Sequence, residues 1–270
     1  MDKAEWSRSR FWLGHFLYSR HDRPPVPWQG GAQLPTVLGP PLARWLRGRL
    51  GRGEDFGPCM IAHAIHGHAQ DPAYIQAVRL WVKERGHHRH LYQQLIGCLA
   101  ASPSQQLPAC NSLGRRILRW RFRLLGARFE MSVQLLDDLV DLAVLRAIDA
   151  IGTGPTVRGV CEIVRREKQA HLAFTRERLT LLYADFNFIR RNLRRLRLRT
   201  MCVALIWQVA RQNGPLLHAA GTTRIRFMRQ TFQQFSTVLE HMVPYRRQAL
   251  LAALVDQRRE PYAKPSQLTS

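Results

Sequence analysis

The sequence is short of acidic residues and of long apolar runs. Its 270 residues include 19 acidic and 41 basic ones, which gives a formal net charge of +22. The longest apolar stretches, such as MCVALIW at 201–207, fall well short of the roughly 20 residues that a membrane-spanning helix needs. The N-terminal segment MDKAEWSRSRFWLGHF carries acids and no continuous apolar core, so it does not resemble a secretory signal. We therefore expect a chain without a transmembrane segment.

Cysteine is scarce and scattered. An odd number of cysteines without any C-x-x-C pair argues against a structural zinc site and against a disulfide framework. This usage favours a reducing compartment, so we expect a cytoplasmic protein. The five cysteines are Cys59, Cys98, Cys110, Cys161 and Cys202.

Lysine is scarce as well. Four of the 41 basic residues are lysine, so 41 − 4 = 37 are arginine, and the arginines are spread along every segment. Two clusters stand out, RRILRWRFR at 115–123 and RRNLRRLRLR at 190–199. We interpret them mainly as solvated helix faces. The alternative is a surface for an acidic partner or nucleic acid, although no DNA- or RNA-binding motif accompanies the clusters, which disfavours nucleic acid.

The chain is predicted to be all-α. From residue 42 onward apolar residues recur at intervals of three and four, and alternating stretches are almost absent. We divide the chain into an extended proline-rich arm at 1–41, a four-helix bundle at 42–185, a helical hairpin packed on the bundle at 186–245, and a helix end with a tail at 246–270.

Turn signals set the limits of the predicted helices. Asp71 is a good N-cap residue, Pro72 suits a first turn, GTGPT at 152–156 is a clear turn, and the proline-rich stretch 101–114 is a long connection. Two helical hairpins joined by one long connection are typical of the ferritin-like variant of the four-helix bundle. The predicted helices cover about 42–68, 72–100, 115–150, 156–184, 186–212 and 222–243.

Acidic residues and histidines recur with the same spacing in the two predicted hairpins. Residues equally far from the turn of an antiparallel hairpin lie at the same height, because both helices rise 1.5 Å per residue, and residues three apart share a helix face. Each hairpin is therefore predicted to direct an acid, a second group and a histidine toward one point in the core. The two sets are Glu54, Glu84 and His87, and Asp138, Lys168 and His171, each with intervals of 30 and three residues.

This arrangement resembles that of the di-iron and di-manganese carboxylate proteins of the ferritin-like type. ERGH at 84–87 fits their Glu-x-x-His motif, and REKQAHLAFTRERL at 166–179 is similar to the stretch that closes the site in many bacterial members. The resemblance covers roughly residues 45–185. It implies an oxidoreductase that binds iron or manganese and activates dioxygen or peroxide for oxidation of a small organic substrate in the apolar core. The implied ligands are Glu54, Glu84, His87, Asp138 and His171.

Lys168 departs from that pattern, since it stands where the family has a metal-bridging glutamate. An ammonium group donates hydrogen bonds and cannot ligate a metal. In a first interpretation, Glu167 replaces the missing ligand, because it lies four residues before His171 and about 40° around the helix.

Two further interpretations of Lys168 stay open. In one, Glu54, Glu84 and His87 hold a single ion, and Lys168 replaces the second ion as a fixed cation. In the other, Lys168 bonds to Glu84 and Asp138 in a buried charge cluster without metal. The protein would then be a scaffold or binding protein whose basic surface docks an acidic partner or nucleic acid.

Overall fold

The computed structural model describes residues 3–50, 56–68, 70–99, 112–184 and 186–243. Over these ranges the chain is helical apart from short connections and contains no strand, so the all-α prediction is confirmed. Its elements are α1 (Lys3–His21), η1 (Trp28–Gly30), η2 (Thr36–Leu38), α2 (Gly39–Leu50), α3 (Phe56–Gly67), α4 (Pro72–Leu99), α5 (Ser112–Ala150), α6 (Pro155–Tyr183), α7 (Phe188–Gln212), α8 (Gly214–Ala219) and α9 (Arg224–Met242).

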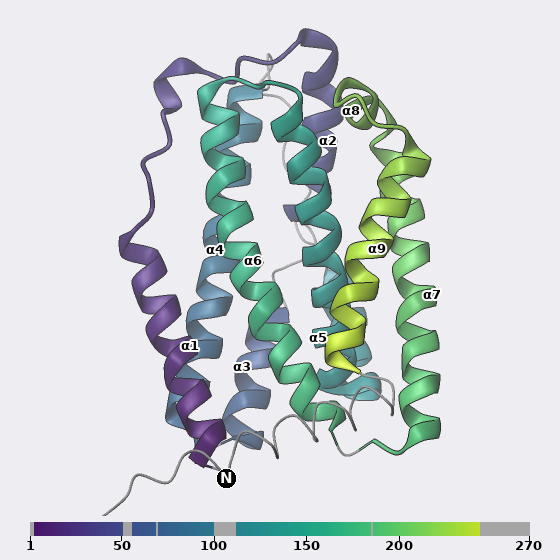
Figure 1. Ribbon diagram of the computed structural model, residues 1–270. Coiled ribbons are helices and arrows are strands. Elements are labelled where there is room, and N and C mark those ends of the chain that lie inside the picture. The colour runs from purple at the N-terminus through teal and green to yellow at the C-terminus, as the bar shows by residue number, and fades with distance from the viewer. Residues whose placement is uncertain (1–2, 51–55, 69, 100–111, 185, 244–270) are drawn as a thin grey trace, which may run out of the picture.

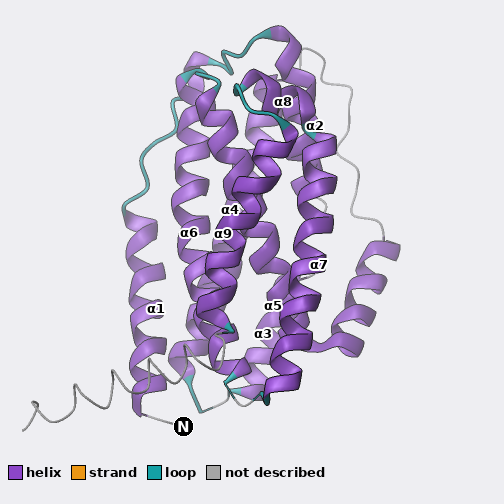
Figure 2. Cartoon of the chain, turned by 45° about the vertical axis from the view of Figure 1, so that its right-hand side comes forward, coloured by secondary structure: helices purple, strands orange, loops and turns teal. Residues whose placement is uncertain are grey.

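The long helices stand side by side as one upright bundle (Figure 1). α5 and α6 form an antiparallel hairpin, and α4 packs against α6. The pair α2 and α3 lies along α4, while α7 and α9 pack together on α5 (Figure 2). The core between these helices includes Trp81 and Phe174, which are fully buried.

The N-terminal segment differs from the extended arm predicted for 1–41. Lys3–His21 is the helix α1, which lies along α4 (Figure 1). Its inner face repeats at intervals of three and four, with Ser9, Trp12 and Phe16 buried. Burial of these rings supplies the tertiary packing that most helices depend on for stability. The proline-rich stretch begins only at Pro24, after the helix has ended.

Helix boundaries follow the turn signals in the sequence. The side chain of Asp71 accepts a hydrogen bond from the backbone N–H of Tyr74 at 2.9 Å, so the predicted N-cap of α4 is confirmed. The helix expected at 42–68 is two helices instead, and residues 51–55 between them lie outside the described chain. α5 is interrupted at Gly126, whose φ of 76° lies in the left-handed region.

None of the helices within the described ranges has an apolar stretch long enough to cross a bilayer. The bundle core holds charged side chains as well as apolar ones. Ten charged side chains of the described ranges are buried: Asp71, Glu84, Glu130, Asp137, Asp138, Asp141, Glu167, Lys168, Arg178 and Arg195. Because burying a charge is costly unless it is paired, their partners define the region of interest.

Candidate functional site: a buried charge network

Lys168 forms ion pairs with two aspartates of α5. Its Nζ lies 2.6 Å from Oδ1 of Asp138 and 2.9 Å from Oδ2 of Asp141. The spacing of 30 residues across the GTGPT turn predicted the contact between Asp138 and Lys168, and the structure confirms it. The contact to Asp141 replaces the predicted one to Glu84.

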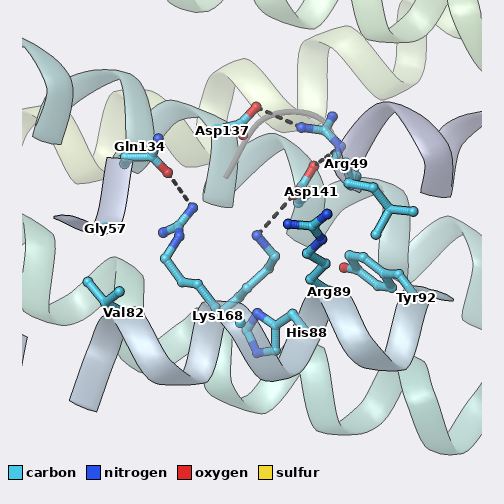
Figure 3. A pocket seen from close by; sticks show the side chains of 13 residues that line it. Arg49, Gly57, Val82, His88, Arg89, Tyr92, Gln134, Asp137, Asp141 and Lys168 are labelled. Carbon is cyan, nitrogen blue, oxygen red and sulfur yellow. Dashed lines mark hydrogen bonds and ion pairs between the residues drawn. The ribbon is translucent and has the colours of Figure 1, made fainter. Parts of the chain in front are cut away.

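Arginines from α2 and α4 also form ion pairs with aspartates of α5. Arg49 places Nη1 2.7 Å from Asp137 Oδ1 and Nε 2.9 Å from Asp141 Oδ1. Arg85 lies 3.0 Å from Asp138 through Nη1. It also donates a hydrogen bond to the side-chain carbonyl of Gln134 (Figure 3). Each of these three aspartates therefore has a cation within 3.0 Å.

Two Glu–His pairs link α4 to α6 in a reciprocal way. Nε2 of His171 lies 2.9 Å from Oε2 of Glu84, and Nε2 of His88 lies 2.8 Å from Oε2 of Glu167. In each helix the histidine follows the glutamate by four residues, so both pairs use the same helix geometry. The two imidazole rings are 5.4 Å apart between centroids, which makes the four side chains one compact cluster.

The N-terminal segment closes this cluster. Ser19 donates a hydrogen bond to Oε1 of Glu84 at 2.8 Å, and Arg23 contacts Glu167 through Nε at 2.6 Å. Arg20 and Arg23 also lie 3.9 and 3.8 Å from Oε1 of Glu84. We call the whole set the central charge network. Its five carboxylates are Glu84, Asp137, Asp138, Asp141 and Glu167, and its five cations are Arg20, Arg23, Arg49, Arg85 and Lys168.

Burial and pairing shift the pKa values within the network in opposite directions. Burial lowers the pKa of His88 to about 4 and that of His171 to about 3, so both imidazoles are neutral at pH 7. Burial alone would raise the pKa of Glu167, but its hydrogen bond to His88 and the charge of Arg23 lower it to about 2. Burial, followed by the charge of Glu167, raises the pKa of Glu84. The two glutamates therefore differ in proton affinity although they share one cluster.

Asp138 and Lys168 hold each other in the ionised form. Burial opposes the charge of Asp138, but Arg85 and Lys168 outweigh it and lower the pKa of this carboxyl group. Burial likewise opposes the ammonium group of Lys168, whereas Asp138 and Asp141 raise its pKa. Lys168 is thus a buried cation at neutral pH, with no lone pair for a metal.

The structure brings together most of the residues that the sequence singled out. Five of them lie in the central charge network or in its Glu–His pairs: Glu84, Asp138, Glu167, Lys168 and His171. Glu54 lies outside the described residues.

The histidine that α4 contributes to the cluster is His88 and not the expected His87. His87 is half-buried, and its Nδ1 has no hydrogen-bond partner among the described residues, whereas His88 is buried against Glu167. His88 lies inside because the inner face of α4 runs through Trp81, Glu84 and His88. The repeated Glu-x-x-x-His at 84–88 and 167–171 is the sequence signal for the observed pairs.

These side chains do not fit the two-metal centre that the spacing suggested. Every carboxylate of the network already faces a fixed cation, so two divalent ions would add four positive charges without a matching set of acids. Within the described ranges no three His, Cys, Asp or Glu side chains are grouped so that they could hold one ion. We therefore derive no chemistry through a metal at this place.

Two cavities are each lined by several residues of the network. The first, of about 270 Å³, is lined by His88, Tyr92 and the cations Arg49, Arg85 and Lys168 (Figure 3). Arg89 lines it as well, and the other three cations are those that pair with the aspartates of α5. The second, of about 400 Å³, lies between α1 and α6, and Glu84 and Glu167 form part of its wall. The second cavity is therefore the one whose wall includes both glutamates of the Glu–His cluster.

Comparison with known proteins gives no assignment: no family model, no curated protein and no solved structure matches the chain.

Proposed function

We propose that this protein binds a small organic amine in the cavity between α1 and α6. The cavity volume of about 400 Å³ is in the range of small-molecule sites. Aromatic side chains of Phe11, Trp12 and Tyr18 line it, together with the carboxylates of Glu84 and Glu167. The single observation that carries the proposal is this pairing of an aromatic wall with two buried carboxylates in one cavity.

The hydrogen bonds of the two glutamates favour a ligand that donates. Each carboxylate oxygen has one close hydrogen-bond partner: Ser19 and His171 for Glu84, and Arg23 and His88 for Glu167. A carboxylate offers about four acceptor positions, so each group can accept further N–H bonds. The aromatic rings add a favourable environment for a cation, since their faces carry partial negative charge. An amine satisfies both features.

The shifted pKa values give the site a means of exchanging a proton with such a ligand. Glu84 lines the cavity, and its raised pKa makes it the more easily protonated of the two glutamates. Glu167 stays ionised beside it, with Oε1 on Arg23 and Oε2 on the neutral His88. A split of this kind between neighbouring carboxylates is common where one group donates a proton and the other stabilises charge.

We further propose that the bundle is ferritin-like, with the pair α2–α3 and the helices α4, α5 and α6 as its four members. The contact between Asp138 and Lys168 supports this proposal, as does the repeated Glu-x-x-x-His on α4 and α6. The iron- or manganese-dependent oxidoreductase activity that the ferritin-like resemblance implies stays a prediction. The amine proposal does not depend on it.

A matched series of ligands tests the proposal. The probes are 2-phenylethylamine, 2-phenylethanol and 3-phenylpropionate, which share a phenylethyl body and carry a positive, zero or negative charge. Isothermal titration calorimetry on the full chain at pH 7 should show the amine binding at least about tenfold more tightly than the carboxylate, a difference of roughly 1.4 kcal/mol. Equal affinities for all three, or no binding of the amine, would overturn the proposal.

Three variants locate the binding. Phe11→Ala removes a wall residue that is largely exposed, so it should weaken amine binding without disturbing the fold. Glu84→Gln should also weaken it while the neutral alcohol is little affected. Glu162→Gln changes an exposed glutamate of the same helix α6 and should leave the affinity at the parent value. Binding that is insensitive to Phe11→Ala and Glu84→Gln would place the ligand elsewhere.

A further inference from the structure

An exposed apolar stripe runs along α7. Ile189, Leu193, Leu196, Val203 and Trp207 are 74, 66, 61, 47 and 53% exposed, respectively. They follow one another at intervals of four, three, seven and four residues, and Thr200 occupies the position that would divide the interval of seven. Alternating steps of three and four are the spacing of the core positions of a coiled coil. We call these six residues the α7 seam.

The seam is separate from the face by which α7 joins the bundle. Leu198, Cys202, Ile206 and Val209 are buried, and they hold α7 against the rest of the molecule. α7 lies at the right-hand edge of the bundle in Figure 1 and packs against α9. A helix with one apolar face buried and a second one exposed has surface available for another element.

The charge on α7 is entirely positive. Its 25 residues include seven arginines and no acid. Arg190, Arg197 and Arg211 are exposed, and each occupies the position that directly flanks the coiled-coil core on one side. The neighbouring α9 adds exposed Arg224 and Arg226. The seam is therefore bordered by a row of positive charge.

We propose that the α7 seam docks an acidic amphipathic helix of a partner protein. From Ile189 to Trp207 the seam spans 19 residues, or 18 helical rises of roughly 27 Å in total, which is enough for two to three heptads of a partner. Acidic side chains of that helix would face Arg190, Arg197 and Arg211, and its apolar residues would pack between those of the seam. This interaction is independent of amine binding in the cavity between α1 and α6.

Charge and spacing select this occupant over two others. A second copy of the chain would bring one row of arginines against another, and like charges across a helical interface are unfavourable. An anionic membrane would satisfy the arginines, but it requires a broad apolar face, whereas the seam is one heptad stripe with arginine directly beside it. The regular three–four spacing serves a helix that inserts its side chains between those of α7.

Binding of a synthetic peptide tests this inference. The probe is a fluorescently labelled helix of about three heptads with Leu at the core positions and Glu at the flanking ones, beside a version with Lys in place of Glu. Fluorescence anisotropy with the full chain should show at least tenfold tighter binding of the acidic peptide, and added salt should weaken it. Equal binding of both peptides would overturn the inference.

Variants on the exposed positions show whether the seam is the docking site. Leu193→Ser and Leu196→Ser should each weaken binding of the acidic peptide about tenfold or more, and because both side chains are exposed the fold is retained. Val37→Ser, at a residue that is 79% exposed on η2, serves as the control and should bind like the parent. Unchanged binding in the two leucine variants would overturn the inference.

Two further measurements cover the other occupants. Sedimentation velocity should show a monomer, and a dimer that Leu193→Ser dissociates would replace the proposed partner with a second copy. Flotation with phosphatidylserine-containing vesicles should recover no protein, and recovery that Leu193→Ser abolishes would point to a membrane instead. Titration of each variant with 2-phenylethylamine should match the parent, which separates failure at the seam from failure of the proposed amine site.

Discussion

Replacement of Lys168 by methionine is the most direct test of the central charge network. Lys168 is 5% exposed, and its Nζ contacts Asp138 and Asp141 at 2.6 and 2.9 Å. Methionine has a similar length and fills the space, so the variant removes the charge and leaves little cavity. Five carboxylates then face four cations. Breaking a buried ion pair by removing one partner typically costs 3–5 kcal/mol, so we expect a loss of about that size at pH 7.

The same variant should respond to pH with a defined sign. In Lys168→Met, Asp138 still has its ion pair with Arg85, and Asp141 still has its ion pair with Arg49. Arg49 is shared, however, because it also pairs with Asp137. The pKa of Asp141 is already raised by burial, and Lys168 is one of the two cations that oppose this rise. Without Lys168 the pKa rises further, so native Asp141 binds a proton more readily than the unfolded chain does. Stability must then fall as pH rises through that pKa, and the deficit relative to the parent should shrink at lower pH.

Urea unfolding followed by far-UV circular dichroism at pH 5 and pH 7 measures both effects. Lys83→Met, at an exposed lysine of α4, is the control and should change stability by no more than about 0.5 kcal/mol. The double variant Lys168→Met/Asp141→Asn restores the charge balance and should be more stable than Lys168→Met alone. A loss below about 1 kcal/mol for Lys168→Met, with no recovery in the double variant, would refute the reasoning.

Three other predictions follow from the same contacts. Burial lowers the pKa of His88 to about 4 from 6.5, so its contribution to stability is complete above pH 6.5 and is lost as pH falls toward 4. This contribution amounts to about 3 kcal/mol. In urea unfolding, the stability of His88→Gln should therefore depend less on pH than that of the parent. Gly126→Ala should destabilise the fold by about 1 kcal/mol, because φ is 76° at this residue. Gly86→Ala lies on the exposed side of α4, where the added Cβ would have no atom within 4 Å, and it should stabilise the fold by roughly 0.5–1 kcal/mol. Thermal unfolding measures both effects. After dialysis against manganese, elemental analysis should find substoichiometric metal in the parent and more in Lys168→Glu, which replaces a cation with a carboxylate; equal uptake would contradict this account of Lys168.

Hydrophobic periodicity and turn residues were enough to predict most of the fold. The cap at Asp71, the α5–α6 hairpin and the contact between Asp138 and Lys168 all follow from local rules and from the equal rise of two antiparallel helices. α1 was missed because prolines dominate the segment after it. Its own signal, the spacing of Ser9, Trp12 and Phe16, becomes decisive only once a surface is available to bury it.

The site was harder to predict because helix geometry leaves a choice between adjacent residues. Positions three and four after Glu84 lie on the same face, at about 300° and 400° around the helix, so His87 and His88 are equally compatible with the spacing. The packing of Trp81 and the reach of Glu167 from α6 decide in favour of His88. The same ambiguity between three and four concealed the symmetry of the two Glu–His pairs, which depends on both intervals being four.

The central charge network has no net charge, so the excess positive charge of the chain lies outside it. Its five cations and five carboxylates cancel, so the remaining 41 − 5 = 36 basic and 19 − 5 = 14 acidic residues account for the whole net charge of +22. α7 alone contributes seven of these charges without a single acid. Arginine therefore serves two separate purposes in this protein: within the bundle it is matched by carboxylates at close range, and along α7 it lies beside exposed apolar side chains, where an acidic partner can supply the missing counter-charge.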